Sequence, residues 1–143
     1  MPIQLSGQAL SRLAAICGML LLPVDMCWAQ SCPIAGQKDE VRVTLYFGRD
    51  RTGQRPVSNI EWRKFAGADL TRAFPDGFTE TDGTGQWRDP ATGHIVREAS
   101  KIVDVVTDGA DLPGRIAALT EDYEKEFQQK SVGVVTAPVC AEF

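Results

Sequence analysis

The sequence predicts an α+β domain with a ferredoxin-like βαββαβ order, in which two helices cover one face of a four-stranded antiparallel sheet. The spacing of apolar residues supports this class. Segments with a period of two alternate with segments with a period of three to four, in the order strand, helix, strand, strand, helix, strand. The two middle strands flank a short turn over residues 89–93, which indicates a hairpin. This arrangement leaves the second face of the sheet uncovered.

Residues 1–29 indicate a cleaved secretory signal peptide. Arg12 precedes an apolar run over residues 13–22, which is too short for the roughly 20 residues that cross a bilayer, and small Ala29 stands where cleavage is expected. The alternative of a buried helix requires a polar face, which the run lacks. A lipoprotein signal fits poorly, because large residues precede Cys17 and Cys27. We therefore expect a single domain over residues 30–143 that is periplasmic or secreted, with no stable membrane span after cleavage.

The charge of the chain argues against a nucleic-acid partner. The net charge is −4, and cleavage of the signal leaves it unchanged because Arg12 and Asp25 are removed together. No stripe of basic residues is present in the sequence, whereas contacts to phosphate dominate the affinity of proteins for DNA and RNA. We therefore expect no nucleic acid to bind.

Two cysteines, Cys32 and Cys140, remain near the two ends of the expected mature domain. An even number of cysteines in an oxidising compartment favours a disulfide. Two free thiols or a redox site are the alternatives, but a redox site more often has the Cys-x-x-Cys spacing, which is absent from the sequence. The sequence thus predicts a Cys32–Cys140 disulfide.

The first strand and first helix are the most clearly defined elements. Residues 41–47 alternate strictly between apolar and other residues, which predicts a strand with one buried face. Ser58 and Glu61 have the spacing of a capping box at the start of a helix. Trp62 comes next at a position that faces the core, and turn residues 74–77 end the helix.

The second half of the chain supplies the hairpin, the second helix and the last strand. We expect Trp87 to pair with Ile95, an irregular edge or bulge at 82–85, and a central strand that continues through 102–106. Asp111 is expected to cap the second helix. The apolar stripe of that helix consists of Ile116, Leu119, Tyr123 and Phe127, and the final strand is expected over 132–136.

Several segments together resemble a known bacterial family. They include Leu45-Tyr-Phe-Gly-Arg49, Phe74-Pro-Asp-Gly-Phe-Thr79, Gly85-Gln-Trp-Arg88, and Arg97-Glu98 with Ser100-Lys101. This ordered set resembles the uncharacterised domain-of-unknown-function family 3574 over nearly all of the mature chain. One departure is Arg72, where the resemblance leads us to expect proline. The resemblance implies a small secreted domain and no particular activity.

Familiar catalytic and cofactor signatures are missing from the sequence. His94, the only histidine, lies six residues from Ser100, too far along an extended strand for a direct hydrogen bond. The glycines at 83 and 85 lack the downstream Lys-Ser/Thr and the helix of a phosphate loop. The sequence also lacks a convincing set of metal ligands. We therefore predict no metal site and no cofactor.

What remains is a group of polar residues on and beside the central strands. One interpretation is a solvated sheet face with weak cross-strand ion pairs. A second is a non-catalytic module that binds a small anionic ligand over the open sheet face, because guanidinium groups bind carboxylates and phosphates. The alternative is a small enzyme that uses Glu98 or Tyr46 in acid–base chemistry. We also expect a homodimer or a protein partner at the open face. The residues predicted to bind the ligand are Arg49, Arg88, Arg97, Tyr46 and Lys101.

Overall fold

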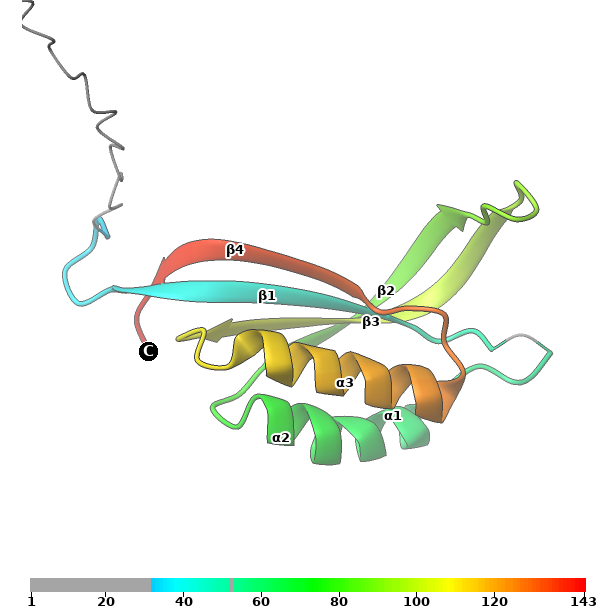
Figure 1. Ribbon diagram of the computed structural model, residues 1–143, viewed down its shortest axis with the longest axis horizontal. Coiled ribbons are helices and arrows are strands. Elements are labelled where there is room, and N and C mark those ends of the chain that lie inside the picture. The colour runs from blue at the N-terminus through cyan, green and yellow to red at the C-terminus, as the bar shows by residue number, and fades with distance from the viewer. Residues whose placement is uncertain (1–31, 52) are drawn as a thin grey trace, which may run out of the picture. The chain divides into compact units, whose positions relative to one another are not determined.

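Four antiparallel strands form one sheet in the order β2-β3-β1-β4 (Figure 1). The computed structural model describes residues 32–51 and 53–143, so the expected signal peptide over 1–29 lies outside the described residues. All helices lie against one face of the sheet, and the β2–β3 hairpin projects beyond them (Figure 1). The α+β class expected from the sequence is confirmed. The strands are β1 (Lys38–Gly48), β2 (Thr79–Arg88), β3 (Ile95–Thr107) and β4 (Gly133–Ala141).

The first helical region is divided into three segments, so the element order departs from a literal βαββαβ. α1 (Asn59–Phe65) is followed by the π-helical segment η1 (Ala66–Leu70) and by α2 (Thr71–Ala73). The capping box predicted at Ser58 is present, because its side chain accepts from the N–H of Glu61 and the Glu61 carboxylate accepts from the N–H of Ser58. The sequence pattern did not predict the π-helical turn within this region.

The second helix, α3 (Leu112–Phe127), lies beside α2 on the same face of the sheet (Figure 1). Asp111 occupies its N-cap position with a φ of 46°, but its side chain makes no capping hydrogen bond, which corrects the expected role. Arg72, at the position where we expected proline, continues the helix and joins the two helices. Its Nη2 lies 2.6 Å from an Asp69 oxygen and 3.1 Å from an Asp122 oxygen on α3.

Aromatic side chains from the sheet and both helical regions form the centre of the core. The Phe47 ring of β1 meets the rings of Trp62 and Tyr123 edge-on, at centroid distances of 5.3 and 4.7 Å. Phe65 and Phe127 complete the group, and all five side chains are buried. Burying each of them contributes roughly 1.5–3 kcal/mol, so this cluster fixes β1 beneath the helices. The Tyr123 hydroxyl donates to the carbonyl of Gly48 at 2.8 Å, and burial raises its pKa.

The hairpin register differs by one residue from the one that the sequence suggested. Trp87 pairs with Val96 rather than with Ile95, and Gln86 pairs with Arg97. β2 also continues through residues 82–85 with unbroken pairing, so the expected bulge is absent there. Because side chains alternate along a strand, this shift changes which residues of the two strands share a face.

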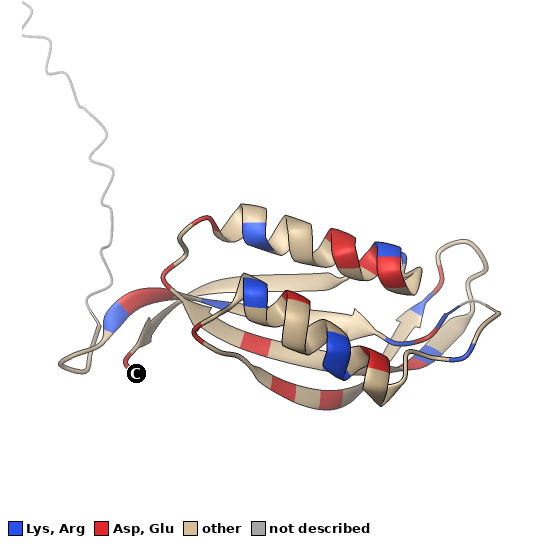
Figure 2. Cartoon of the chain, turned by 90° about the horizontal axis from the view of Figure 1, so that it is seen from below, with Lys and Arg blue, Asp and Glu red and all other residues tan. Residues whose placement is uncertain are grey.

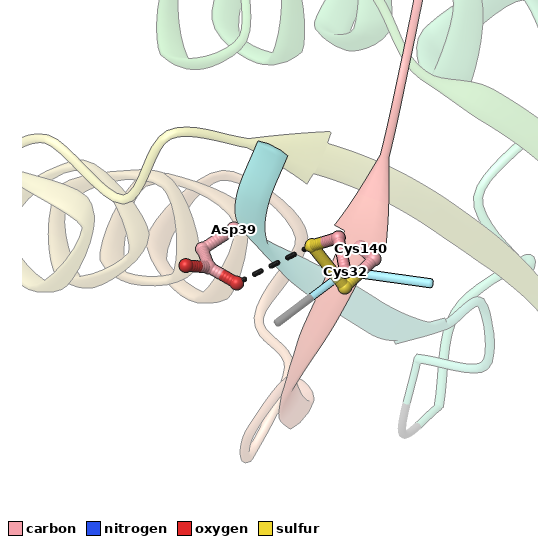
Figure 3. The surroundings of a disulfide bond; sticks show 3 residues. All are labelled: Cys32, Asp39 and Cys140. Atoms are coloured by element: carbon pink, nitrogen blue, oxygen red, sulfur yellow. Dashed lines mark hydrogen bonds between the residues drawn. A yellow bond between two sulfur atoms is a disulfide. The ribbon is translucent and has the colours of Figure 1, made fainter. Parts of the chain in front are cut away.

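A disulfide joins Cys32 to Cys140, as the sequence predicted (Figure 3). The two Cα atoms are 5.5 Å apart. Cys140 lies on β4 opposite Asp39 of β1, so the bond ties the segment before β1 to the end of the last strand. Within residues 32–51 and 53–143, no helix is long and apolar enough to span a membrane.

Candidate functional site

The most promising site is a hollow of about 800 Å³ on the open face of the sheet, at the end that carries the hairpin. Its volume falls within the range of about 300–1,000 Å³ that is typical of ligand sites. Three chain segments surround it: the end of β1, the paired strands of the hairpin, and the loop between α3 and β4. We call it the hairpin hollow, and its main polar and aromatic lining residues are Tyr46, Asp50, Arg51, Trp87, Asp89, Glu98, Ser100 and Lys130.

Three glycines let backbone and side chains approach closely around the hairpin hollow. A Cβ atom at Gly48 would lie only 2.7 Å from Oε2 of Glu98, so the carboxylate rests against the bare backbone of β1. A Cβ atom at Gly133 would lie 3.3 Å from Cβ of Tyr46 on the neighbouring strand. Gly85, directly opposite Glu98, adds no side chain to the floor. The small residues therefore leave room for the side chains of Glu98 and Tyr46 on this face.

Trp87 and Glu98, both in the lining of the hairpin hollow, are joined by a hydrogen bond. The indole Nε1–H donates to Oε1 of Glu98 at 3.1 Å. Both residues point toward the open face, since Trp87 is paired with Val96, two positions from Glu98. Trp87 is 37 % exposed and Tyr46 is 44 % exposed. The hollow thus offers aromatic surfaces together with a carboxylate.

Most charges around the hairpin hollow are already paired. Arg51 Nη2 lies 3.0 Å from Oε1 of Glu61, away from the hollow. Asp89 accepts the N–H groups of Ala91 and Thr92, which lower its pKa, and Lys130 lies 3.8 Å from its second oxygen. By contrast, Glu98 has no cationic partner among the described residues. Over the molecule, basic and acidic residues are interspersed rather than gathered by sign (Figure 2).

The structure separates the five residues predicted to bind the ligand. Tyr46 lines the hairpin hollow on the open face. Arg97 shares the other face with buried Lys101 and Val103, because odd-numbered residues of β3 point toward the helices. Arg88, opposite Ile95, lies on that same face. The structure therefore does not bring all five together over the open face, and their part in binding a ligand stays a prediction.

The predicted arginines also have partners within the chain. Arg49 Nε donates to the carbonyl of Val57 at 2.7 Å, and Arg88 Nη1 donates to the carbonyl of Gly93 at 3.0 Å. Arg97 Nε donates to Oε1 of Gln86 at 2.7 Å. These contacts fasten the loop before α1 and the tip of the hairpin. Anion binding by the arginines stays a prediction of the sequence.

Lys101 is a buried, charged residue on the face of the sheet that the helices cover. Its Nζ lies 2.8 Å from a carboxylate oxygen of Asp82 and 3.4 Å from one of Glu80. Glu80 also accepts the indole N–H of Trp62 at 2.7 Å, and Lys101 lowers the pKa of Asp82. A buried ammonium requires such partners. We interpret this group as a structural link between β2, β3 and α1.

The sequence placed Tyr46, Glu98 and Ser100 in one polar group on the sheet, but it did not place Trp87 with them. Glu98 entered the prediction only through the enzyme alternative, and no sequence pattern pointed to Lys130. The alternation of β1 and β3 indicates that Tyr46, Glu98 and Ser100 lie on one face once the pairing is known. The missing information was the register of the hairpin, which places Trp87 beside them.

Two smaller features of the structure also bring polar groups or sulfur atoms together. A hollow of about 620 Å³ lies at the opposite end of the open face, but Arg42 there is bound to Asp104 at 3.0 Å. The sulfurs of Cys32 and Cys140 and a carboxylate oxygen of Asp39 lie within 4.8 Å of one another (Figure 3). Disulfide sulfurs lack the thiolate charge that binds metal ions. Neither feature competes with the hairpin hollow as a ligand site.

A sequence profile described as "Protein of unknown function (DUF3574)" matches residues 42–143. The chain belongs to the DUF3574 family. This membership confirms the resemblance inferred from the sequence. No curated protein matches the chain. Three of the segments that carried the resemblance, around Tyr46, Trp87 and Glu98, converge in this DUF3574 protein on the hairpin hollow.

Several solved structures are similar to this DUF3574 protein at low sequence identity. A phage SAM lyase in complex with S-methyl-5'-thioadenosine has a TM-score of 0.55 and 16% identity, covering 80% of this chain and 95% of the lyase chain. The lyase in its apo state has a TM-score of 0.51 and 19% identity, covering 77% and 94%. CutA from Synechococcus elongatus PCC7942 has a TM-score of 0.48 and 13% identity, covering 73% and 80%. At these identities the likeness concerns the fold alone.

Proposed function

We propose that this DUF3574 protein is an exported, non-catalytic module that binds a small organic ligand in the hairpin hollow. The observation that carries the proposal is the convergence of Trp87, Tyr46 and Glu98 on a hollow large enough for such a ligand. Ligand sites typically combine apolar and aromatic walls with a few polar groups that fix orientation. The ligand would lie against the aromatic rings and hydrogen-bond to the Glu98 carboxylate.

The hydrogen bonds of the predicted arginines support ligand binding in the hairpin hollow rather than at the arginines. Arg49, Arg88 and Arg97 each donate to an acceptor of the same chain. Trp87 and Tyr46, in contrast, expose more than a third of their surface. The exposed surfaces of these rings, beside the Glu98 carboxylate, are available for contact with a ligand.

The proposal is tested by a ligand screen with two readouts, the melting temperature and the intrinsic tryptophan fluorescence, to which Trp62 and Trp87 contribute. Compounds with flat rings are the first probes, and S-methyl-5'-thioadenosine is included because the similar phage lyase binds it. A compound at 100 times its Kd stabilises the protein by about 2.7 kcal/mol. The shift in melting temperature should be lost in Trp87→Ala and kept in Val135→Ala, a matched change of an exposed residue on β4. A hit that shifts both variants equally would contradict binding in the hollow.

One observation favours a second candidate, the small enzyme expected as the alternative. Tyr46 and Glu98, the two residues named for acid–base chemistry, both line the hairpin hollow. Among the described residues no hydrogen bond joins their side chains, so a substrate would have to lie between them. The test is turnover of the ligands found by the screen. Product formation that Glu98→Gln abolishes without weakening binding would establish the enzyme and refute the non-catalytic module.

A further inference from the structure

The position of Lys130 bears on the chemistry of the ligand. Its ammonium Nζ lies 5.8 Å from the centroid of the Trp87 ring, within the range of a cation–π contact. Lys130 belongs to the loop between α3 and β4, and its side chain is 75% exposed. A charged group of the protein thus stands over the exposed aromatic ring of the hairpin hollow. This contact shows that a cation fits at this place.

The Glu98 carboxylate supplies the negative charge for such a cation. Its Oε1 accepts from Trp87 and its Oε2 lies against Gly48, so the group is held in place from two sides. The two cations of the lining have other partners, since Arg51 contacts Glu61 and Lys130 lies beside Asp89. The lining therefore has three carboxylates, Asp50, Asp89 and Glu98, and two cations, an excess of one negative charge.

We propose that the ligand of the hairpin hollow carries a compact organic cation, such as an alkylated ammonium group. The cation would bind over the Trp87 ring beside Glu98 and displace the Lys130 ammonium. The Lys130 ammonium can leave the Trp87 ring at little cost, because a mostly exposed lysine is hydrated again once it moves into the solvent. An alkylated cation is weakly hydrated, so it loses less on entering an aromatic site than a primary ammonium does. This inference rests on the proposed function and specifies the ligand class of the same site.

The central test compares choline with 3,3-dimethyl-1-butanol, its uncharged isostere, by calorimetry on the full chain. A cation–π contact of about 0.5–2 kcal/mol corresponds to about 2- to 30-fold in affinity. We expect choline to bind at least about 5-fold more tightly than the isostere. Equal affinities for the two compounds would overturn the inference.

Three variants locate the effect. Glu98→Gln keeps the shape of the side chain and should reduce the preference for choline to about 2-fold or less. Trp87→Leu should remove it, with circular dichroism used to verify the fold. Lys130→Met removes the competing ammonium and should tighten choline binding by about 2- to 5-fold. Lys125→Met is the matched control, because Lys125 pairs with Glu121 on α3 outside the hollow.

The outcomes separate this inference from the proposed function. If compounds of the screen bind in the hollow but choline shows no preference over its isostere, the cation inference fails and the binding module stands. If Trp87→Ala changes the binding of neither these probes nor any compound of the screen, both the cation inference and the proposed function fail. Weaker choline binding in Lys130→Met would refute the displacement of Lys130.

Discussion

Removal of the Cys32–Cys140 disulfide should cause one of the largest losses of stability available in this fold. The two residues are 108 positions apart in sequence. In the chain-entropy treatment, a cross-link of that span limits the unfolded ensemble and stabilises the folded state by about 4.8 kcal/mol at 25 °C. For a domain of this size, that loss corresponds to a fall in melting temperature of about 20 °C. The effect acts on the unfolded chain, because β1 and β4 already hold these ends together in the folded protein.

The assay is urea unfolding of the wild type and of a Cys32→Ala/Cys140→Ala variant, followed by circular dichroism. Wild type treated with reductant provides a second comparison without substitution. Intact mass after alkylation establishes that the purified wild type has no free thiols. A difference below about 1.5 kcal/mol in the free energy of unfolding would refute this reasoning. It would mean that the bond only restrains the segment before β1.

Four further predictions concern acid stability, assembly, export and the arginines. The hydrogen bonds from Ser58 lower the pKa of Glu61 to about 2, so its contribution to stability is present above about pH 5 and is lost as the pH falls toward 2. In Glu61→Gln, the free energy of unfolding should therefore fall less between about pH 5 and pH 2 than in the wild type. Glu126→Gln, on the exposed side of α3, should leave this pH dependence unchanged. A homodimer at the open face should appear in light scattering at high concentration and dissociate in Val135→Lys; a monomer at all concentrations would exclude it. Fractionation of cells should recover a mature chain that begins near residue 30 in the periplasm or medium, and an uncleaved cytoplasmic chain would contradict export. If Arg97 binds an anion, phosphate or small carboxylates should raise the melting temperature of the wild type and not that of Arg97→Ala.

The fold was predictable because its signals are local. The alternation of residues 41–47 and the capping box at Ser58 each lie within a few positions, and both appear in the structure as expected. The helical stripe that contains Tyr123 and Phe127 likewise needs only its own spacing, and both side chains are buried. Such periodicities determine which residues face the core without knowledge of the partner strands.

The site was less predictable because it depends on how strands pair. A hairpin turn over 89–93 is compatible with pairings that differ by one residue, and each choice moves a set of side chains to the other face. The sequence alone suggested Ile95 as the partner of Trp87, whereas the structure pairs Trp87 with Val96. The contact between Trp87 and Lys130 joins segments 43 positions apart in the chain, and no short pattern predicts it.

The projecting β2–β3 hairpin has a consequence for how binding could be detected. β1 pairs with β3 only at residues 100–107, so the part of β3 before Ser100 has β2 as its only strand neighbour. Two-stranded ribbons are marginally stable alone, and local opening allows their amides to exchange with solvent. We expect the amide hydrogens of residues 95–99 to exchange with deuterium faster than those of residues 101–106. A ligand that bridges the hairpin to the loop around Lys130 would slow that exchange. The exchange rates of residues 95–99 would therefore show whether the hollow is occupied, while the exchange rates in the rest of the sheet would not change.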